Sequence, residues 1–491
     1  MKSYINICIS LCMLTLVFST QGTFGDEETA VVNSGNIPKT GKPLVVESKK
    51  KPHQQWVPKE TYSIEQLVGY TKRADPEYSR YGGIKSTQFP ATGFFYTTKY
   101  NDRWWLVDPE GHLCIHKAIC SVTPGGSDNY KKALQEKYGT EQAWAESTAT
   151  VLKKYGFNGT GSWSADSMFA GTKDRPVYAR KWSFMSSYGK QRGVARMGTG
   201  NHTYQGNVIC VFDPDFEAFV DDYAKQLAET KDDPYLLGHF SDNELPFRLE
   251  ALENFLKLNK GDPGYQAAIT WLQKRKGKQD VSAGDITPED REAFLGFYMD
   301  RYYSIVSKAI KKYDPNHLYL GSRLIRVSGI EPAIRAYANH VDVMSVNWYG
   351  DWMFPRERFE SWAAWVDKPF ILSEWYAKGH DVPGLTNESG AGWLVKTQKE
   401  RGYYYQNMAL NLMASKSCVG WHWFRYSDND PADLTTDPSN RNSNKGIVNI
   451  KYEPYAELVD AMKAVNTQAY RIIEFFDDAS YEECTQSNLH R

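Results

Sequence analysis

The chain has 491 residues, and 58 Lys and Arg against 59 Asp and Glu give a net charge of −1 at pH 7. This balance disfavours nucleic acid and anionic membranes as partners. Apolar residues (41%) and charged residues (24%) occur at ordinary globular levels, which excludes multi-span membrane proteins and disordered chains. Aromatic residues are abundant (14%), so some rings are expected to face a ligand.

The first 25 residues have the pattern of a secretory signal peptide. Lys2 precedes an uncharged apolar run over residues 5–18, and small residues before Asp26 offer a cleavage site. The chain is therefore expected to be secreted or periplasmic. A surface-anchored lipoprotein is the alternative, although no small residue directly precedes Cys12. The remaining cysteines are widely spaced and form neither a disulfide framework nor a zinc motif.

The segment after the signal is expected to lack regular structure. Residues 26–60 are polar and basic, include three consecutive lysines at 49–51, and are interpreted as a flexible leader. Residues 61–100 are predicted to be an amino-terminal extension that packs on the main domain. Two strand-like runs around the turn at 108–111 predict a hairpin that leads into a core strand.

From residue 112 onward, short apolar runs alternate with longer helical patterns, which is typical of βα units with a parallel sheet. Strands are expected near residues 112–120, 157–163, 182–187 or 208–212, 235–242, 318–323, 341–347, 369–374 and 418–424. Helices are expected near residues 140–155, 215–230, 290–312, 330–338, 356–366, 391–414 and 453–468. The pattern predicts a (β/α)8 TIM barrel over residues 101–475, with loop insertions at 164–208 and 249–290 and a carboxy-terminal tail at 476–491.

Two of the predicted strands end in glutamates. In LLGHFSDNELPF the fourth strand is followed by Asn243 and Glu244, and in KPFILSEWYAKG the seventh strand reaches Glu374. A carboxylate at the end of a buried strand costs free energy unless it has a partner or a chemical role. Either glutamate alone is therefore also interpretable as a structural ion pair or a helix cap. Together, on strands four and seven, they indicate a shared pocket at the carboxyl end of the barrel.

These residues resemble the retaining glycoside hydrolases of clan A. More narrowly, the segments YGFNGTGSWS, GHFSDNELPF and CVGWHWFRYSDND are similar to glycoside hydrolase family 50, the β-agarases. The resemblance implies that Glu244 is the acid/base, Glu374 the nucleophile and Asn243 a ligand of the sugar 2-hydroxyl. Cleavage of a β-linked galactan would then proceed by double displacement. In such an enzyme one carboxyl is protonated, the other is ionised, and about 5 to 5.5 Å separates them.

Sugars offer apolar faces and hydroxyl groups, so flat aromatic and polar side chains are expected at the strand ends. The predicted substrate-binding residues are Asn243, Trp163, Arg323, Asn347, Tyr349, Trp375, Trp421 and Trp423. Trp421 and Trp423 alternate along the eighth strand and point to one side, so one of them is expected to be a sugar platform; core packing is the alternative. By the clan A resemblance, Tyr349 donates a hydrogen bond to the nucleophile. Arg323 is expected to contact a substrate hydroxyl or sulfate, or to form an ion pair with a carboxylate.

No cofactor and no required metal are expected. The acidic residues Asp428, Asp430 and Asp433 lack EF-hand spacing and are interpreted as a solvated loop, with a calcium site as the alternative. Three histidines are interpreted as core residues: His116, His239 and His422.

The expected partner is a polysaccharide or oligosaccharide, with no nucleic acid and no membrane-spanning segment. Two alternatives to a β-agarase remain open. One is a clan A hydrolase of another β-glycan, such as porphyran, carrageenan, galactan or β-glucan. The other is a glycan-binding barrel without turnover. The sequence leaves endo or exo action and the oligomeric state undetermined.

Overall fold

The computed structural model describes residues 37–198 and 201–482. The predicted signal peptide and residues 483–491 of the predicted tail lie outside this part of the chain, whereas the start of that tail belongs to a helix that ends at Asp477. Within it, no helix is long and apolar enough to cross a membrane. The division into an extension and a barrel domain at residue 100 stays a prediction.

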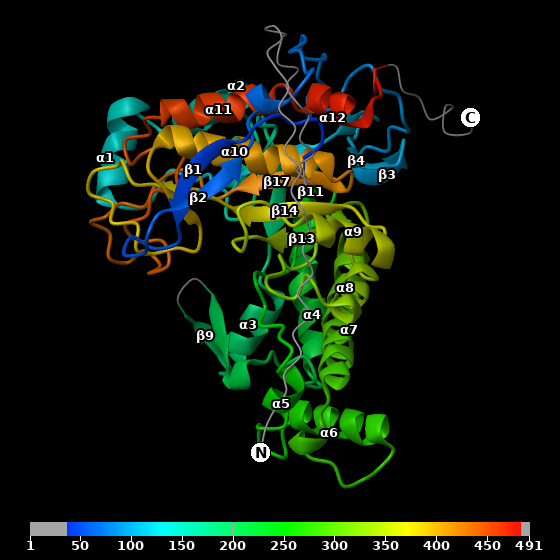
Figure 1. Ribbon diagram of the computed structural model, residues 1–491. Helices are drawn as coiled ribbons and strands as arrows, with labels where there is room; N and C mark the ends of the chain where they lie inside the picture. Colours follow the sequence, from blue (N-terminus) through cyan, green and yellow to red (C-terminus); the bar gives the residue numbers. More distant parts are fainter. Residues whose placement is uncertain (1–36, 199–200, 483–491) are drawn as a thin grey trace, which may run out of the picture.

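An eight-stranded parallel sheet forms the centre of the described part, with the strand order β12-β11-β8-β7-β6-β17-β14-β13 (Figure 1). Its strands are β6 (His116–Ile119), β7 (Gly159–Thr160), β8 (Val177–Lys181), β11 (Leu236–Phe240), β12 (Leu318–Tyr319), β13 (Met344–Asn347), β14 (Phe370–Trp375) and β17 (Cys418–Trp423). The sheet curls so that its edge strands approach each other. An isolated parallel bridge joins Leu324 to Val346, and the backbone N–H of Asn347 donates to the carbonyl of Leu324 over 2.9 Å.

Helices cover the outside of the curled sheet. They include α2 (Glu141–Lys154), α4 (Phe216–Ala224), α7 (Pro288–Tyr313), α8 (Glu331–Ala338), α9 (Arg356–Trp365), α10 (Gln398–Ala414), α11 (Ala456–Asn466) and α12 (Ala469–Asp477). The longest, α7, begins at a capping box between Thr287 and Asp290 and ends before Pro315, which cannot continue a helix. Small and branched side chains such as Ala179 and Val419 fill the interior of the curl.

Strands and helices alternate as the sequence predicts, but the third strand was predicted at the wrong residues. The third strand of the series is β8 at Val177–Lys181, whereas residues 182–187 or 208–212 were expected. The prediction is wrong because β8 contains two cations, Arg180 and Lys181, and does not present the apolar run that identifies a buried strand. Residues 182–187 instead lead into helix α3 (Phe184–Gln191).

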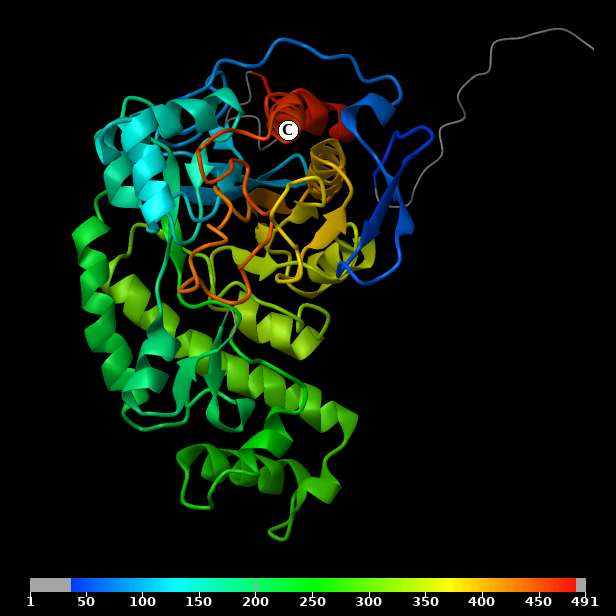
Figure 2. The same cartoon turned by 90° about the vertical axis from the view of Figure 1, so that its left-hand side faces the viewer.

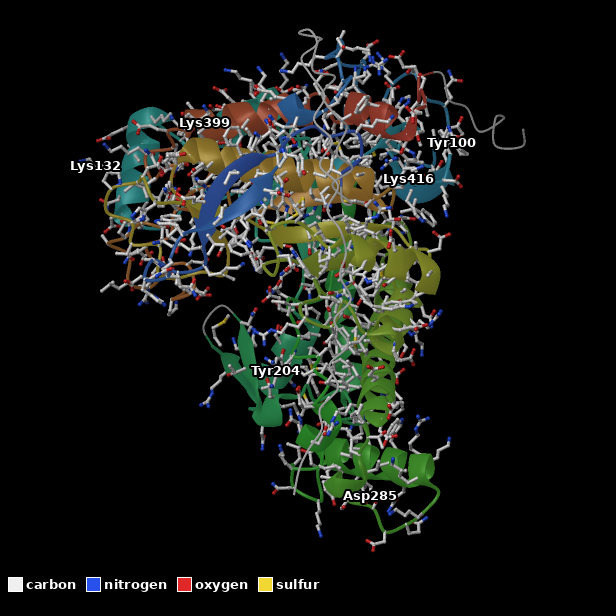
Figure 3. All side chains as sticks on the ribbon, viewed as in Figure 1. Tyr100, Lys132, Tyr204, Asp285, Lys399 and Lys416 are labelled. Atoms are coloured by element: carbon white, nitrogen blue, oxygen red, sulfur yellow. The ribbon has the colours of Figure 1, made fainter. Side chains whose placement is uncertain are left out.

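The two predicted insertions contain regular structure of their own. The first carries α3 and the hairpin β9 (Ala195–Met197) with β10 (His202–Tyr204), and Figure 3 labels Tyr204 there. The second carries α5 (Ala251–Phe255), α6 (Pro263–Lys276) and the turn at Asp285. In Figures 1 and 3 the second insertion lies at one end of the molecule, far from Lys416.

Residues 44–61 form a hairpin, which corrects the prediction of an unstructured leader. Strand β1 (Leu44–Lys49) pairs with β2 (Val57–Thr61) and with β16 (Trp393–Val395), which in turn pairs with β15 (Ala377–Gly379). Figure 2 shows the blue hairpin against this part of the chain. Local composition does not reveal this hairpin, because the strand that pairs with β1 lies more than 300 residues away. For the same reason the helix expected from residue 391 begins only at Gln398.

The predicted hairpin that precedes the barrel is present as three antiparallel strands. They are β3 (Tyr96–Tyr100), β4 (Arg103–Val107) and β5 (Leu113–Cys114). The turn at 108–111 joins β4 to β5, and β5 leads directly into β6. Among the described residues the cysteines are free thiols, as the absence of a disulfide framework indicated.

Candidate active site

Glu244 and Glu374 lie at the carboxyl end of the sheet and line one cavity of about 440 Å³. Glu244 follows β11, and Glu374 is the next-to-last residue of β14. Parallel strands bring their carboxyl ends to the same edge, so residues separated by 130 positions share one pocket. The sequence-based expectation that these two side chains face a common hollow agrees with this geometry.

Glu374 is held by two hydrogen-bond donors. The guanidinium of Arg323 donates to its Oε2 over 2.6 Å and also to the carbonyl of Ser373 over 3.0 Å. The hydroxyl of Tyr349 donates to its Oε1. Arg323 is fully buried, so its charge is not screened by water. An ionised carboxylate suits both donors, and this arrangement equips Glu374 to act as a nucleophile.

Glu244 has amide donors and no ion pair within the described ranges. Asn347 donates to its Oε1 over 2.8 Å, and Asn201 donates to its Oε2 over 2.6 Å. Burial, followed by the negative charge of Glu374, raises the pKa of Glu244 and outweighs both amide hydrogen bonds. A raised pKa keeps a carboxyl protonated nearer neutral pH, which a general acid requires.

A chain of amides fixes the orientation of Glu244. Asn243 donates to Asn201 over 3.0 Å, and Asn347 also lies 3.3 Å from the side-chain oxygen of Asn243. Ser373, the neighbour of Glu374, donates to the oxygen of Asn347 over 2.8 Å. Asn243 lines the cavity, whereas Asn347 is buried outside the lining and donates a hydrogen bond to Glu244. The predicted contact between Asn347 and substrate is therefore replaced by a contact with Glu244.

Several residues just after the strands have left-handed backbone angles. The φ values are 54° at Ser121, 63° at Trp163, 50° at Glu244 and 52° at Arg323. Non-glycine residues seldom adopt this region, and such strain collects at functional sites. The strand ends therefore hold these side chains in place by a backbone conformation that the rest of the fold maintains.

Three of the predicted substrate-binding residues are buried in the core. Trp375, Trp421 and Trp423 have no exposed surface, and none of them lines the cavity. They lie between the sheet and α10, where Trp375 and Trp423 pack on Tyr405 and Trp421 donates to its hydroxyl over 2.9 Å. The alternation along β17 was identified correctly but assigned to the wrong face, because His422 is the residue that points into the curl, against Phe240.

Other aromatic side chains line the cavity. Trp163 is 40% exposed and packs edge-on against Phe424, with Tyr349 and Tyr376 nearby in the lining. Trp163 also lies 4.3 Å from the guanidinium of Arg323, measured from the ring centroid. The exposed ring makes Trp163 the predicted platform that the structure brings to the site.

Sequence reasoning missed the contribution of the β9–β10 hairpin. Asn201, His202 and Met197 come from the first insertion and line the cavity beside Glu244. Asn201 belongs to a glycosylation-like Asn-His-Thr motif and follows no strand of the eight-stranded sheet, so no local signal assigned it to the site. Only the tertiary position of the insertion reveals it.

Removing the exposed ring tests the platform. Trp163→Ala is expected to raise KM for oligosaccharides about 10-fold, which corresponds to about 1.4 kcal/mol of lost binding, and to change kcat little. Initial rates over a range of oligosaccharide concentrations separate the two constants. Trp163→Phe should retain most of the affinity, and an unchanged KM in the alanine variant would remove Trp163 from substrate binding.

The acidic loop after β17 has structural hydrogen bonds. Asp428 is buried and accepts from the backbone N–H of Lys445 over 2.8 Å and of Gly446 over 2.7 Å, and from the hydroxyl of Tyr455 over 2.5 Å. Asp430 accepts from the hydroxyl of Ser127 over 2.6 Å. These bonds secure the segment that lines the cavity at Lys445, which differs from the solvated loop expected for Asp428.

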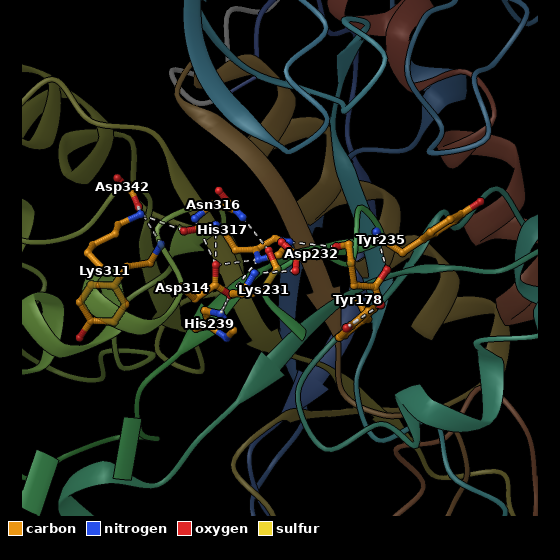
Figure 4. Close-up of polar contacts among 12 residues, drawn as sticks. Tyr178, Lys231, Asp232, Tyr235, His239, Lys311, Asp314, Asn316, His317 and Asp342 are labelled. Carbon is orange, nitrogen blue, oxygen red and sulfur yellow. Dashed lines mark hydrogen bonds and ion pairs between the residues drawn. The ribbon is translucent and has the colours of Figure 1, made fainter. Parts of the chain in front are cut away.

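His239 of β11 forms a buried cluster with Asp314 and His317, which lie between α7 and β12 (Figure 4). His239 accepts from Trp182 over 2.9 Å, so its other nitrogen donates to Asp314 over 2.7 Å. His317 contacts Asp314 over 2.8 Å and the carbonyl of Asp233 over 2.9 Å. Burial would raise the pKa of Asp314, but the hydrogen bonds from both histidines outweigh it and lower that pKa. Each ring nitrogen of His239 and His317 therefore has a hydrogen-bond partner in the protein, which indicates a structural role for the cluster.

Chelation tests this interpretation. Incubation with EDTA is expected to leave both the midpoint of thermal unfolding and hydrolytic activity unchanged, because the histidine nitrogens already have protein partners. Differential scanning calorimetry with and without chelator measures the first quantity. A fall in either quantity that Zn²⁺ restores would identify the histidine cluster as a metal site, and restoration by Ca²⁺ would identify the loop at Asp428.

No family model matches the chain. Among curated proteins it is similar to β-agarase B of Vibrio sp. (strain JT0107), with 28% identity over 504 residues that cover 81% of this chain and 50% of that protein. β-Agarase A of the same strain is 27% identical over 393 residues, covering 70% of this chain and 37% of that protein. The chain thus spans about half the length, or less, of these curated relatives.

Solved structures give the same indication. The crystal structure of BpGH50 has a TM-score of 0.79 at 29% identity, covering 89% of this chain and 96% of that one. The structure of an exo-β-agarase, at 22% identity, has a TM-score of 0.68 and covers 83% of this chain and 69% of that one, which shows a shared fold. The similarity to glycoside hydrolase family 50 that the sequence motifs indicate is confirmed.

Proposed function

We propose that the chain is a retaining glycoside hydrolase that cleaves β-linked galactan, specifically agarose or agaro-oligosaccharides, on a (β/α)8 barrel. The observation that carries the proposal is the contrast between two carboxyl groups in one cavity. Glu374 contacts a buried guanidinium, whereas Glu244 has a raised pKa and only amide donors. Two such environments supply the nucleophile and the acid of a double displacement. The β-agarase names of both curated relatives support the galactan substrate.

The first step forms a glycosyl-enzyme ester. A carboxylate oxygen of Glu374 attacks the anomeric carbon while Glu244 gives its proton to the glycosidic oxygen, so the leaving sugar departs as an alcohol. In the second step Glu244, now ionised, takes a proton from water, and the water oxygen displaces Glu374 from the anomeric carbon. Arg323 and Tyr349 hold the carboxylate that is consumed and regenerated.

Product analysis on defined glycans tests the proposal. Agarose and neoagaro-oligosaccharides should be cleaved to shorter chains, and proton NMR of the first product should show a retained β-anomer. Porphyran, carrageenan, galactan and β-glucan serve as comparison substrates. If one of these is cleaved faster than agarose, that glycan is the substrate. An inverted anomer would exclude double displacement. Glycan binding without new reducing ends would identify a binding protein.

Export is the second part of the proposal and depends on residues 1–25. The charged start and apolar run favour export, and the small residues Thr23 and Gly25 favour cleavage before Asp26, with Ser19 as another site. Expression of the full chain in a Gram-negative host, followed by fractionation and sequencing of the mature amino terminus, measures it. Retention of the intact terminus in the cytoplasm would contradict export.

A further inference from the structure

The lysine run at 49–51 belongs to the ordered hairpin, and two of its ammonium groups reach the wall of the cavity. Lys50 donates to the backbone carbonyl of Tyr349, and Lys51 donates to the carbonyls of Glu388 and Gly390 over 2.7 and 3.3 Å. We propose that Lys50 and Lys51 are positioning residues of the active site, so that the amino-terminal hairpin completes the wall that the barrel alone leaves unsupported. This inference rests on the proposed function for its kinetic consequences.

Lys50 acts through Tyr349. Its ammonium lies 3.6 Å from the ring centroid of Trp393 and bonds to the backbone of the tyrosine whose hydroxyl donates to Glu374. Burial lowers the pKa of Lys50 to about 7, partly opposed by the charge of Asp351. The carbonyl of Tyr349 and the ring of Trp393 hold the Lys50 ammonium on two sides, so its bond to the carbonyl restrains the backbone of Tyr349. Lys50 thereby sets where the tyrosine hydroxyl meets the nucleophile.

Lys51 shares its task with Lys378, which belongs to β15. Lys378 donates to the carbonyls of Asn387 and Ser389 over 2.9 and 3.0 Å. Carbonyls at alternate positions therefore bond to Lys378, and those between them bond to Lys51. The segment 387–390 is thereby clamped between two ammonium groups.

The clamped segment contributes directly to the cavity. Gly390 and Ala391 line it, and the N–H of Ala391 donates to the hydroxyl of Tyr376 over 2.9 Å. Tyr376 in turn packs edge-on against Tyr349, with ring centroids 5.2 Å apart. Displacement of the segment would therefore move the wall and release the contact between Ala391 and Tyr376.

The test compares three methionine variants, each of which keeps much of the lysine volume. Lys50→Met is expected to lower kcat about 10-fold at nearly constant KM, and Lys50→Arg should restore most of it. Lys51→Met is expected to raise KM about 5-fold at nearly constant kcat, because it loosens the wall and leaves Glu374 in place. Lys59→Met is the matched control: Lys59 lies on the same hairpin, 5.1 Å from the same Trp393 ring. It should leave both constants unchanged.

Hydrogen–deuterium exchange gives a readout that needs no substrate. Lys51→Met should increase exchange at the amide of Ala391 at least 5-fold, whereas Lys59→Met should not, and all variants should share the thermal midpoint of the natural protein within a few degrees. Unchanged exchange and unchanged kinetics in both Lys50→Met and Lys51→Met would overturn the inference. If the unmutated protein cleaves no galactan, the proposed function is wrong. The role of Lys51 is then still decided by the exchange measurement, which needs no substrate.

Discussion

Glu374→Gln is expected to lower kcat by about 10⁴-fold, equivalent to about 5.5 kcal/mol of transition-state stabilisation. An amide nitrogen cannot displace the leaving sugar as a carboxylate does, so no glycosyl ester forms. The amide oxygen can still accept from Arg323, and the chain should therefore fold. Reducing-end release from neoagaro-oligosaccharides measures the loss, and circular dichroism checks the fold.

A smaller side chain provides the control for this variant. Glu374→Ala opens space at the anomeric carbon, and added azide is expected to restore cleavage of an activated aryl β-galactoside with formation of the α-glycosyl azide. Inversion in the rescued product and retention in the natural reaction together identify Glu374 as the displaced nucleophile. Near-normal activity of Glu374→Gln, or a β-azide product, would contradict that role.

Glu244→Gln is expected to lower kcat on natural oligosaccharides by about 10³-fold, within the range that general acid catalysis contributes. Sugar alkoxides are poor leaving groups and need the proton, whereas a dinitrophenolate leaves without it. The first step on a dinitrophenyl galactoside should therefore proceed at nearly the natural rate, visible as a burst. An equal loss on both substrates would remove Glu244 from the acid role.

The same variant has a pH signature. In the natural protein, kcat/KM should fall as pH rises through the pKa of Glu244, because the ionised form has no proton to donate. That pKa is raised by burial and by the charge of Glu374, so the decline should begin above the usual range for a glutamate. Glutamine does not titrate, and the basic limb of the profile should be absent from Glu244→Gln. A persistent limb would assign the titration to another group.

Local sequence patterns predicted most of the scaffold. Helices such as α2, α7 and α8 begin and end within about three residues of the expected positions, since capping residues and prolines mark their ends. The two glutamates were identifiable because Glu244 follows an apolar strand and Glu374 lies at the end of another. What could not be predicted depends on distant pairing: β1 needs β16 to become a strand, and Asn201 reaches Glu244 from an insertion.

The aromatic residues show a different limit. A period of two places Trp421 and Trp423 on one face of β17 but does not say whether that face is the interior of the curl or the layer beneath α10. Tyr405 of helix α10 accepts a hydrogen bond from Trp421 and packs against Trp423. The sequence of β17 alone does not indicate this contact with another element. Trp163 was the better candidate for a sugar platform, because it follows the end of the two-residue strand β7 and its ring is exposed.

The left-handed residues after the strands bear on efforts to make the protein heat-tolerant. Each non-glycine residue held at such an angle costs about 1 to 2 kcal/mol, which glycine would recover. Libraries screened for survival at high temperature should therefore enrich glycine at Ser121 and Glu244, and the clones with glycine at Glu244 should be robust but inactive. Arg323 should be retained, because its buried guanidinium is paired with Glu374 and its loss costs more than the backbone relief. Engineering for durability has to draw its gains from other parts of the chain.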